Sequence, residues 1–292
     1  MRDDQPSTTA RIAAFARAHH ACYDRPVILD DQLAPAWFTD EERAMFSQHL
    51  AQAADFFLPG ETFATPAAAR AAVLRAQSIP INVARARYAE DTLLALISTG
   101  TRYVLLGAGL DAFAFRRIPL DIDVIEIDHP ATQRWKRARI AQLGWSIPPR
   151  LAFIERDLVR DALDLAPAPS VIAWLGVTYY LSREAIGKTL DSLAALATPG
   201  SALVLDYLDD AAFDPARCAP SIARMQEAVR RTGEPMQSGF APADLARLLG
   251  EHGWRVDEDL GADAIAARYF AGRDDGLAPM PHFRLARATR KL

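Results

Sequence analysis

From residue 102 to residue 208 the chain alternates short apolar runs with stretches of helical pattern. The apolar runs cover residues 102–106, 124–127, 151–154, 171–175 and 202–208. They are continuous rather than alternating, as expected for strands that are buried on both faces. Parallel strands with helices on both sides of the sheet meet that condition. The rhythm therefore predicts an α/β protein with a Rossmann-like, doubly wound and mostly parallel sheet.

Two further strands in the carboxyl-terminal part bring the expected sheet to seven. We place them at residues 255–257 and 283–288. The last strand is expected to place two sets of side chains on opposite faces, Phe283, Leu285 and Arg287 against Arg284, Ala286 and Ala288. Helices are expected between Ser182 and Pro199, and over residues 243–249. Residues 209–239 are less regular, and we interpret the region around 209–240 as an insertion that covers the substrate.

The first hundred residues have helical patterns and predict a helical extension that forms a lid, with residues 101–292 as the core. A capping box of Thr39 and Glu42 begins one helix. One apolar face of that helix is expected to carry Met45, Phe46, Leu50, Ala53 and Ala54, before Pro59-Gly60 ends it. A second helix is expected over residues 66–77. A third is expected after the break at Pro80, with Asn82 as its cap and Gly100 as its end.

Composition excludes several classes of protein. The 292 residues carry a formal charge of −4, whereas a protein that neutralises nucleic-acid phosphates needs a basic stripe. No apolar run is long enough for a membrane span, and no signal peptide is visible. The two cysteines, Cys22 and Cys218, exclude a disulfide scaffold and indicate a reducing, cytoplasmic setting.

Small and acidic residues follow three successive strands. The first strand runs into residues 107–112 (GAGLDA), the second ends at Asp128, and the third is followed by Asp157 and Leu158. Ligands bind at the carboxyl ends of strands in such sheets, and glycines let a ligand approach the backbone. An acidic residue at the end of the second strand can hold the hydroxyls of a ribose. The pair Asp157 and Leu158 after the third strand can hold an adenine. Taken singly, the glycines could form a plain tight turn, and Asp128 and Asp157 could each cap a helix. The glycines also fit a dinucleotide-binding site. Together the three features predict a nucleoside-containing cofactor.

Five sequence blocks in order resemble the leucine carboxyl methyltransferase family, especially its bacterial branch of polyketide carboxyl O-methyltransferases of the tetracenomycin type. The resemblance covers roughly residues 10–210, and more loosely the carboxyl-terminal strands. It implies a class I methyltransferase fold that binds S-adenosylmethionine. The blocks are residues 85–91 (RARYAED), 104–111 (VLLGAGLD), 126–130 (EIDHP), 156–158 (RDL) and 174–181 (WLGVTYYL).

The resemblance also implies roles for single residues. Arg85 would hold the carboxylate of the methionine moiety, with Arg87 as a second candidate, and a guanidinium suits that task because it pairs with a carboxylate through two hydrogen bonds. Part of the family has Glu at the position of Leu175, so here any contact would come from the backbone. The other implied cofactor contacts are Gly107, Ala108 and Gly109 at the turn, Asp128 on the ribose, His129 near the cofactor, and Asp157 with Leu158 around the adenine.

The resemblance implies methylation of a carboxylate on a small-molecule acceptor, such as an intermediate of secondary metabolism. A carboxylic acid is ionised at neutral pH and needs no general base, so no catalytic residue is assigned. The acceptor pocket is expected between the N-terminal helices, the stretch after the fifth strand, and the side chains of Tyr23, Tyr179 and Tyr180. His19 and His20 have no metal-ligand spacing, and no metal is expected.

Alternatives remain open from the sequence. A phenol could be the acceptor in the same fold, although it would profit from a general base. The glycine turn also suits an NAD-dependent oxidoreductase, in which Arg85 and the pair at residues 157–158 have no evident task. A non-catalytic module that keeps the cofactor pocket is a third possibility. No nucleic-acid or membrane partner is expected, a peptide acceptor has no visible groove, and monomer and homodimer are both open.

Overall fold

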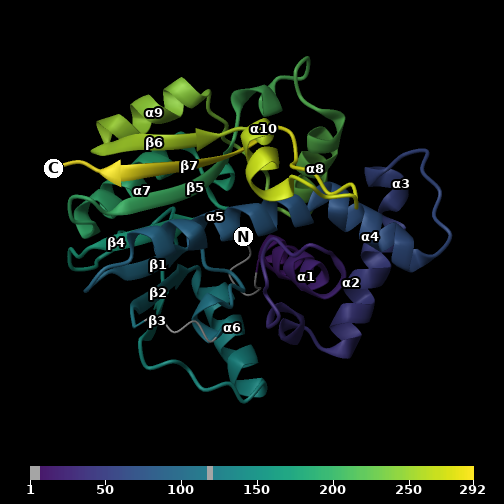
Figure 1. Ribbon diagram of the computed structural model, residues 1–292, viewed down its shortest axis with the longest axis horizontal. Helices are drawn as coiled ribbons and strands as arrows, with labels where there is room; N and C mark the ends of the chain where they lie inside the picture. Colours follow the sequence, from purple (N-terminus) through teal and green to yellow (C-terminus); the bar gives the residue numbers. More distant parts are fainter. Residues whose placement is uncertain (1–6, 117–120) are drawn as a thin grey trace.

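The structure is a computed structural model that describes residues 7–116 and 121–292. In this part of the chain seven strands form one sheet in the order β3-β2-β1-β4-β5-β7-β6. All neighbours are parallel except β7, which runs antiparallel to β5 and β6 (Figure 1). This confirms the predicted doubly wound, mostly parallel, seven-stranded sheet. The strands are β1 (Arg102–Leu106), β2 (Asp123–Asp128), β3 (Leu151–Glu155), β4 (Ser170–Trp174), β5 (Ala202–Leu208), β6 (Trp254–Leu260) and β7 (Phe283–Arg290).

Helices cover both faces of the sheet because both faces are apolar. On one face, side chains of α7 and α9 pack against alternate residues of β1, β4 and β5. On the other face, α5, α6 and α10 complete a second apolar core. The helices are α1 (Thr8–Tyr23), α2 (Asp40–Gln52), α3 (Ala54–Phe57), α4 (Pro66–Gln77), α5 (Ile79–Leu96), α6 (Pro130–Gln142), α7 (Arg183–Leu196), α8 (Pro220–Arg231), α9 (Pro242–Glu251) and α10 (Ala262–Ile265).

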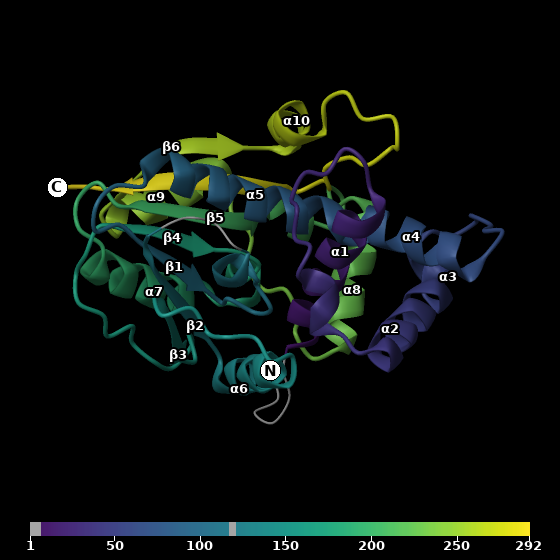
Figure 2. The same cartoon turned by 60° about the horizontal axis from the view of Figure 1, so that its bottom comes forward.

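The helices α1, α2, α3, α4 and α8 gather at one end of the molecule. Both views place them beyond the carboxyl ends of the parallel strands, opposite the end where the chain terminates (Figures 1 and 2). Contacts of α8 with α3 and α4 join the N-terminal helices to the segment after β5. Among the helices that the structure describes, none combines the length and the hydropathy that crossing a bilayer requires.

Four details of the N-terminal helices differ from the prediction. The capping box of Thr39 and Glu42 is present, but α2 ends at Gln52, and Met45 is 42% exposed rather than part of an apolar face. Asn82 does not cap the third helix. That helix, α5, begins at Ile79 because proline fits the first helical turn, where its missing N–H is not needed. It also ends earlier than predicted, at Leu96.

One further difference lies in the carboxyl-terminal half, where another prediction is confirmed. The irregular stretch after Asp209 contains a twelve-residue helix, α8, whose Pro220 stands in the first turn. Its apolar residues Ile222, Met225 and Val229 recur at helical spacing on one face. The alternation predicted for the last strand is confirmed, because Phe283 and Leu285 pack in the core on one face of the sheet and Ala286 and Ala288 pack in the core on the other face. Both alanines are fully buried because β7 lies between β5 and β6.

Candidate cofactor and acceptor site

One large cavity of about 580 Å³ lies at the carboxyl ends of the parallel strands. Its wall is formed by the ends of β1, β2 and β4 together with residues of α1, α4, α5 and α8. The cavity brings together most of the residues that the sequence predicted for the site. These are Arg85, Gly107, Ala108, Gly109, Asp128, His129, Asp157, Leu158, Leu175, Tyr179 and Tyr180.

Two predicted site residues do not line this cavity. The Arg87 side chain is 48% exposed on the outer side of α5, where it pairs with Asp91 at 2.7 Å and donates to the Ile28 carbonyl. Tyr23 is the last residue of α1 and is 68% exposed. The structure therefore separates both residues from the position of the predicted cofactor.

The glycine turn brings its backbone close to a neighbouring loop. The Gly107 and Ala108 N–H groups both donate to the Ile127 carbonyl, which ties the turn to β2. Gly107 has a φ of +70°, a conformation that favours glycine. A Cβ atom at this position would lie 2.3 Å from Cγ2 of Val177, so a larger residue would force Val177 to move. The turn thus exposes main-chain atoms, rather than side chains, to the cavity.

Asp128 ends β2 beside the turn and orders it. Its two carboxylate oxygens accept hydrogen bonds from the Gly109 N–H at 2.5 Å and from the His129 N–H at 2.6 Å. The helix cap that Asp128 alone could have supplied comes from His129, whose ring accepts from the Ala131 N–H. Burial raises the pKa of Asp128, and the two N–H donors oppose that rise. Since a carboxylate offers about four lone-pair sites, acceptor capacity remains for a ligand.

Asp157 and Leu158 follow β3 at the same edge of the sheet. Asp157 does not begin a helix. Its carboxylate accepts from the Val159 N–H at 2.9 Å and closes a tight turn. The turn places Leu158 and Val159 in the cavity wall, where they offer an apolar surface next to the Asp157 carboxylate.

Arg85 lines the cavity and is held there in a polar network. Its Nη1 donates to Oδ2 of Asp206 at 3.1 Å and to the Tyr179 hydroxyl at 2.9 Å, and its Nη2 donates to Asn82 at 2.6 Å. Burial lowers the pKa of Arg85, but Tyr179 and Asp206 outweigh that effect and raise it, so the guanidinium stays charged. A Cβ on Gly176 would lie 2.5 Å from Nη2 of Arg85, so the guanidinium packs on bare backbone there.

Sequence reasoning missed several residues of the site. Asp206 is fully buried, and its second oxygen accepts from the Gly176 N–H at 2.5 Å. A single carboxylate inside the apolar run 202–208 is the signal that could have identified it, because an unpaired buried charge is costly. The lining residues of α1 and α8 gave no comparable signal because neither helix was predicted. They include Thr9, Ala10, Ile12, Ala13, Met225, Ala228 and Val229.

The end of the cavity farther from the sheet is mostly apolar. Leu50, Phe57, Val73, Met225 and Val229 line it, and they come from α2, α3, α4 and α8. Aromatic rings stand between this end and the strands, where Tyr179 and Tyr180 lie 4.8 Å apart between ring centroids. Within residues 7–116 and 121–292, no cluster of three or more His, Cys, Asp or Glu side chains could hold a metal ion.

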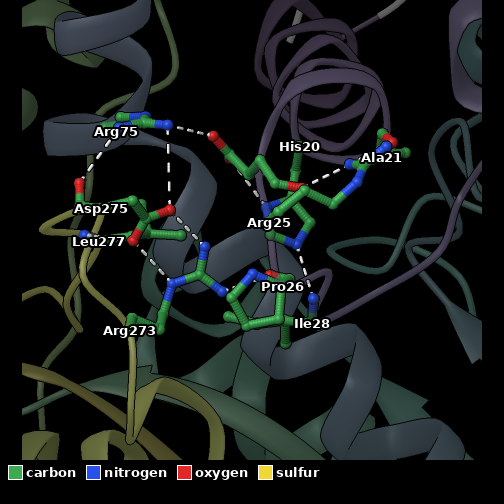
Figure 3. Close-up of polar contacts among 10 residues, drawn as sticks. His20, Ala21, Arg25, Pro26, Ile28, Arg75, Arg273, Asp275 and Leu277 are labelled. Carbon is green, nitrogen blue, oxygen red and sulfur yellow. Dashed lines mark hydrogen bonds and ion pairs between the residues drawn. The ribbon is translucent and has the colours of Figure 1, made fainter.

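A buried polar cluster fixes the helices that form this end (Figure 3). His20 accepts from the Ile28 N–H through Nε2, so its Nδ1 carries the proton that is donated to Asp24. Arg75 donates to the other oxygen of Asp24 at 2.6 Å and to the Asp275 carbonyl at 3.2 Å. These bonds connect the end of α1, the last turn of α4 and the segment around residue 275.

Comparison with known proteins gives consistent results. Residues 10–194 match the family model for leucine carboxyl methyltransferase. The Bacillus subtilis (strain 168) protein YktD, provisionally named as an S-adenosyl-L-methionine-dependent methyltransferase, is 33% identical over the whole of both chains. A similarly named protein of Mycobacterium sp. (strain JLS) is 31% identical, with 88% of this chain and 86% of that protein covered. The crystal structure of a possible exported protein of Bordetella parapertussis shares the fold, with a TM-score of 0.55, 14% identity and coverage of 97% of this chain and 93% of that one.

Proposed function

Since this chain belongs to the leucine carboxyl methyltransferase family and is an S-adenosylmethionine-dependent methyltransferase, we propose that it methylates a carboxylate oxygen of a small-molecule acceptor. The observation that carries the proposal is the cavity itself. It joins the Asp128 carboxylate and a glycine turn at one end to an apolar chamber at the other. The assignment to the tetracenomycin branch stays a prediction.

The residues at the sheet edge fit the cofactor. Asp128 keeps free lone pairs for two ribose hydroxyls, and Gly107 and Gly109 expose main-chain atoms next to it. Asp157 and Leu158 can hold the amino group and one face of the adenine. When bound, S-adenosylmethionine supplies a methyl group on a positively charged sulfur.

Arg85 fits the methionine carboxylate, although it already has a protein partner. The bonds to Asp206, Tyr179 and Asn82 use three of its five N–H groups in the described part of the chain. The others remain available as donors. Asp206 fixes the guanidinium so that it is ordered before the ligand arrives, which lowers the entropic cost of binding.

The apolar chamber favours a carboxylate over a neutral acceptor. Transfer from a sulfonium to a carboxylate joins a positive and a negative charge into two neutral products, and the attraction between those charges is stronger where water is excluded. A carboxylate also needs no base, whereas a phenol must lose a proton. Glu234 lines the cavity and accepts from the Thr9 N–H, and it is the residue that a phenol mechanism would have to recruit. We infer that α1 to α4 cover the bound acceptor as a lid.

The linkage formed by the transferred methyl group tests this proposal. The protein is incubated with S-adenosylmethionine labelled in the methyl group and with panels of small apolar carboxylic acids and phenols. We expect labelled products whose methyl group is released as methanol by alkali, with one S-adenosylhomocysteine per label and no proton released. Base-stable label from the phenols, with one proton per turnover, would contradict the carboxylate assignment. Binding of the cofactor without any S-adenosylhomocysteine formation would instead support a non-catalytic module.

A further inference from the structure

Gln77 carries a buried side-chain amide in the wall of the cavity. It is the last residue of α4, lines the cavity with Val73 of the same helix, and is 6% exposed. Within the part of the chain that the structure describes, neither Nε2 nor Oε1 of Gln77 has a hydrogen-bond partner. A buried polar group left in this condition costs free energy, so the protein loses stability by keeping an amide at this position.

Other buried polar side chains in the cavity wall are satisfied. Arg17 donates to Asp31 at 2.9 Å and to the Leu110 carbonyl at 2.7 Å. Asn82 donates to the Ser78 carbonyl at 2.8 Å and accepts from Arg85. These two side chains connect different segments of the protein through hydrogen bonds. In the described part of the chain, the Gln77 amide makes no such connection.

The backbone that carries Gln77 is firmly placed. Arg75, two residues earlier, connects the last turn of α4 to Asp24 and to the segment around residue 275 (Figure 3). Ser78 then ends α4 with its N–H donated to the Leu74 carbonyl, and α5 begins at the next residue. The amide is therefore presented from a fixed position, which is what specific recognition of a ligand requires.

We propose that Gln77 determines acceptor specificity by binding a neutral group of the acceptor that both donates and accepts hydrogen bonds, such as a hydroxyl or an amide. This inference rests on the proposed function, and it extends the acceptor class to an apolar acid with a second, uncharged polar group away from its carboxylate. A side-chain amide offers one donor group and one acceptor group. A second carboxylate could only accept from Nε2 and an ammonium could only donate to Oε1, so either group would leave half of the amide unsatisfied and would also bury a charge.

Four matched acids test the inference by calorimetry in the presence of S-adenosylhomocysteine. They are octanoic acid, 8-hydroxyoctanoic acid, suberic acid monoamide and 8-aminooctanoic acid. We expect wild type to bind the hydroxy acid and the monoamide roughly 10-fold more tightly than the other two, as one or two hydrogen bonds to a buried amide allow. In Gln77→Leu, octanoic acid should become the tightest ligand. Gln52→Leu is the matched control, because Gln52 also ends its helix but is exposed.

Stability gives a second readout that does not depend on the acceptor. Gln77→Leu should unfold at a higher denaturant concentration than wild type, because the variant removes an unsatisfied buried amide. Lower stability in Gln77→Leu, an unchanged preference in that variant, or failure of wild type to bind or prefer the hydroxy acid and the monoamide would overturn the inference. Failure of the proposed function is distinguished by the methyl-transfer assay, in which wild type would then form no alkali-labile methyl ester from any of the four acids. Gln77→Leu should bind S-adenosylhomocysteine as wild type does, which shows that the cofactor site is intact.

Discussion

Replacement of Lys136 by Met is expected to lower the free energy of unfolding by about 3–5 kcal/mol. Lys136 and Glu126 form an ion pair at 2.5 Å in which both side chains are fully buried. Nζ of Lys136 also donates to the Asp111 carbonyl at 2.6 Å, so the pair supports the segment after the glycine turn. Methionine preserves the length of the side chain but leaves the Glu126 carboxylate buried without a cation. Chemical denaturation at pH 8 measures the loss.

Two controls and a pH series show whether the loss comes from the buried charge. Lys188→Met removes an exposed pair with Glu184 on α7 and should cost no more than about 0.5 kcal/mol. Adding Glu126→Gln to Lys136→Met should recover part of the loss.

Burial raises the pKa of Glu126, and Lys136 opposes the rise. A carboxyl with a higher pKa in the folded state stabilises at low pH and loses that contribution as pH rises. The variant should therefore be closest to wild type near pH 5, and an equal loss at pH 5 and pH 8 would contradict this explanation.

Asp128→Ala is expected to weaken S-adenosylmethionine binding by about 100-fold or more. The estimate follows from the loss of hydrogen bonds between a charged acceptor and two ribose hydroxyls, each worth about 1.5–3 kcal/mol. The substitution also frees the Gly109 N–H, which Asp128 holds at 2.5 Å, and this loosens the turn. Calorimetric titration measures the affinity, and the denaturation midpoint shows that the variant is folded.

The control for this change is Asp164→Ala, since Asp164 is exposed and outside the cavity wall. It should bind the cofactor as wild type does.

Burial raises the pKa of Asp128, so protonation removes its negative charge at a higher pH than for an ordinary aspartate. As pH is lowered, cofactor affinity should therefore begin to fall at a higher pH than an ordinary aspartate would give, and this fall should be absent in Asp128→Ala. Retention of wild-type affinity in Asp128→Ala would place the ribose elsewhere.

The parallel core could be predicted from sequence because burial on both faces imposes continuous apolar runs. The predicted run 202–208 matches β5, and the carboxyl ends of adjacent parallel strands necessarily share one edge. That geometry brings Asp128 and the glycine turn together although nineteen residues separate Gly109 from Asp128. The helix following Ser182 was equally predictable, because its buried stripe has a regular period.

Residues that depend on tertiary contacts could not be predicted in this way. Asp206 acquires its role from Arg85, which is 121 residues away in the chain. Gln77 differs from a surface glutamine only because α8 and the N-terminal helices bury it. Residues 209–239 were interpreted as irregular, although Pro220 stands in the first turn of α8, where its missing N–H is not needed. Arg87 lies two residues from Arg85 and therefore points to a different side of α5.

Titration of the purified protein with S-adenosylmethionine, S-adenosylhomocysteine and NAD tests the cofactor assignment most directly. The structure and the family both predict saturable binding of the two adenosyl compounds and none of NAD. Asp128, the glycine turn and Arg85 would then be the binding site to vary first. Saturable binding of NAD, with no response to either adenosyl compound, would contradict the assignment of S-adenosylmethionine as the cofactor. The glycine turn would then be interpreted as part of a dinucleotide-binding site.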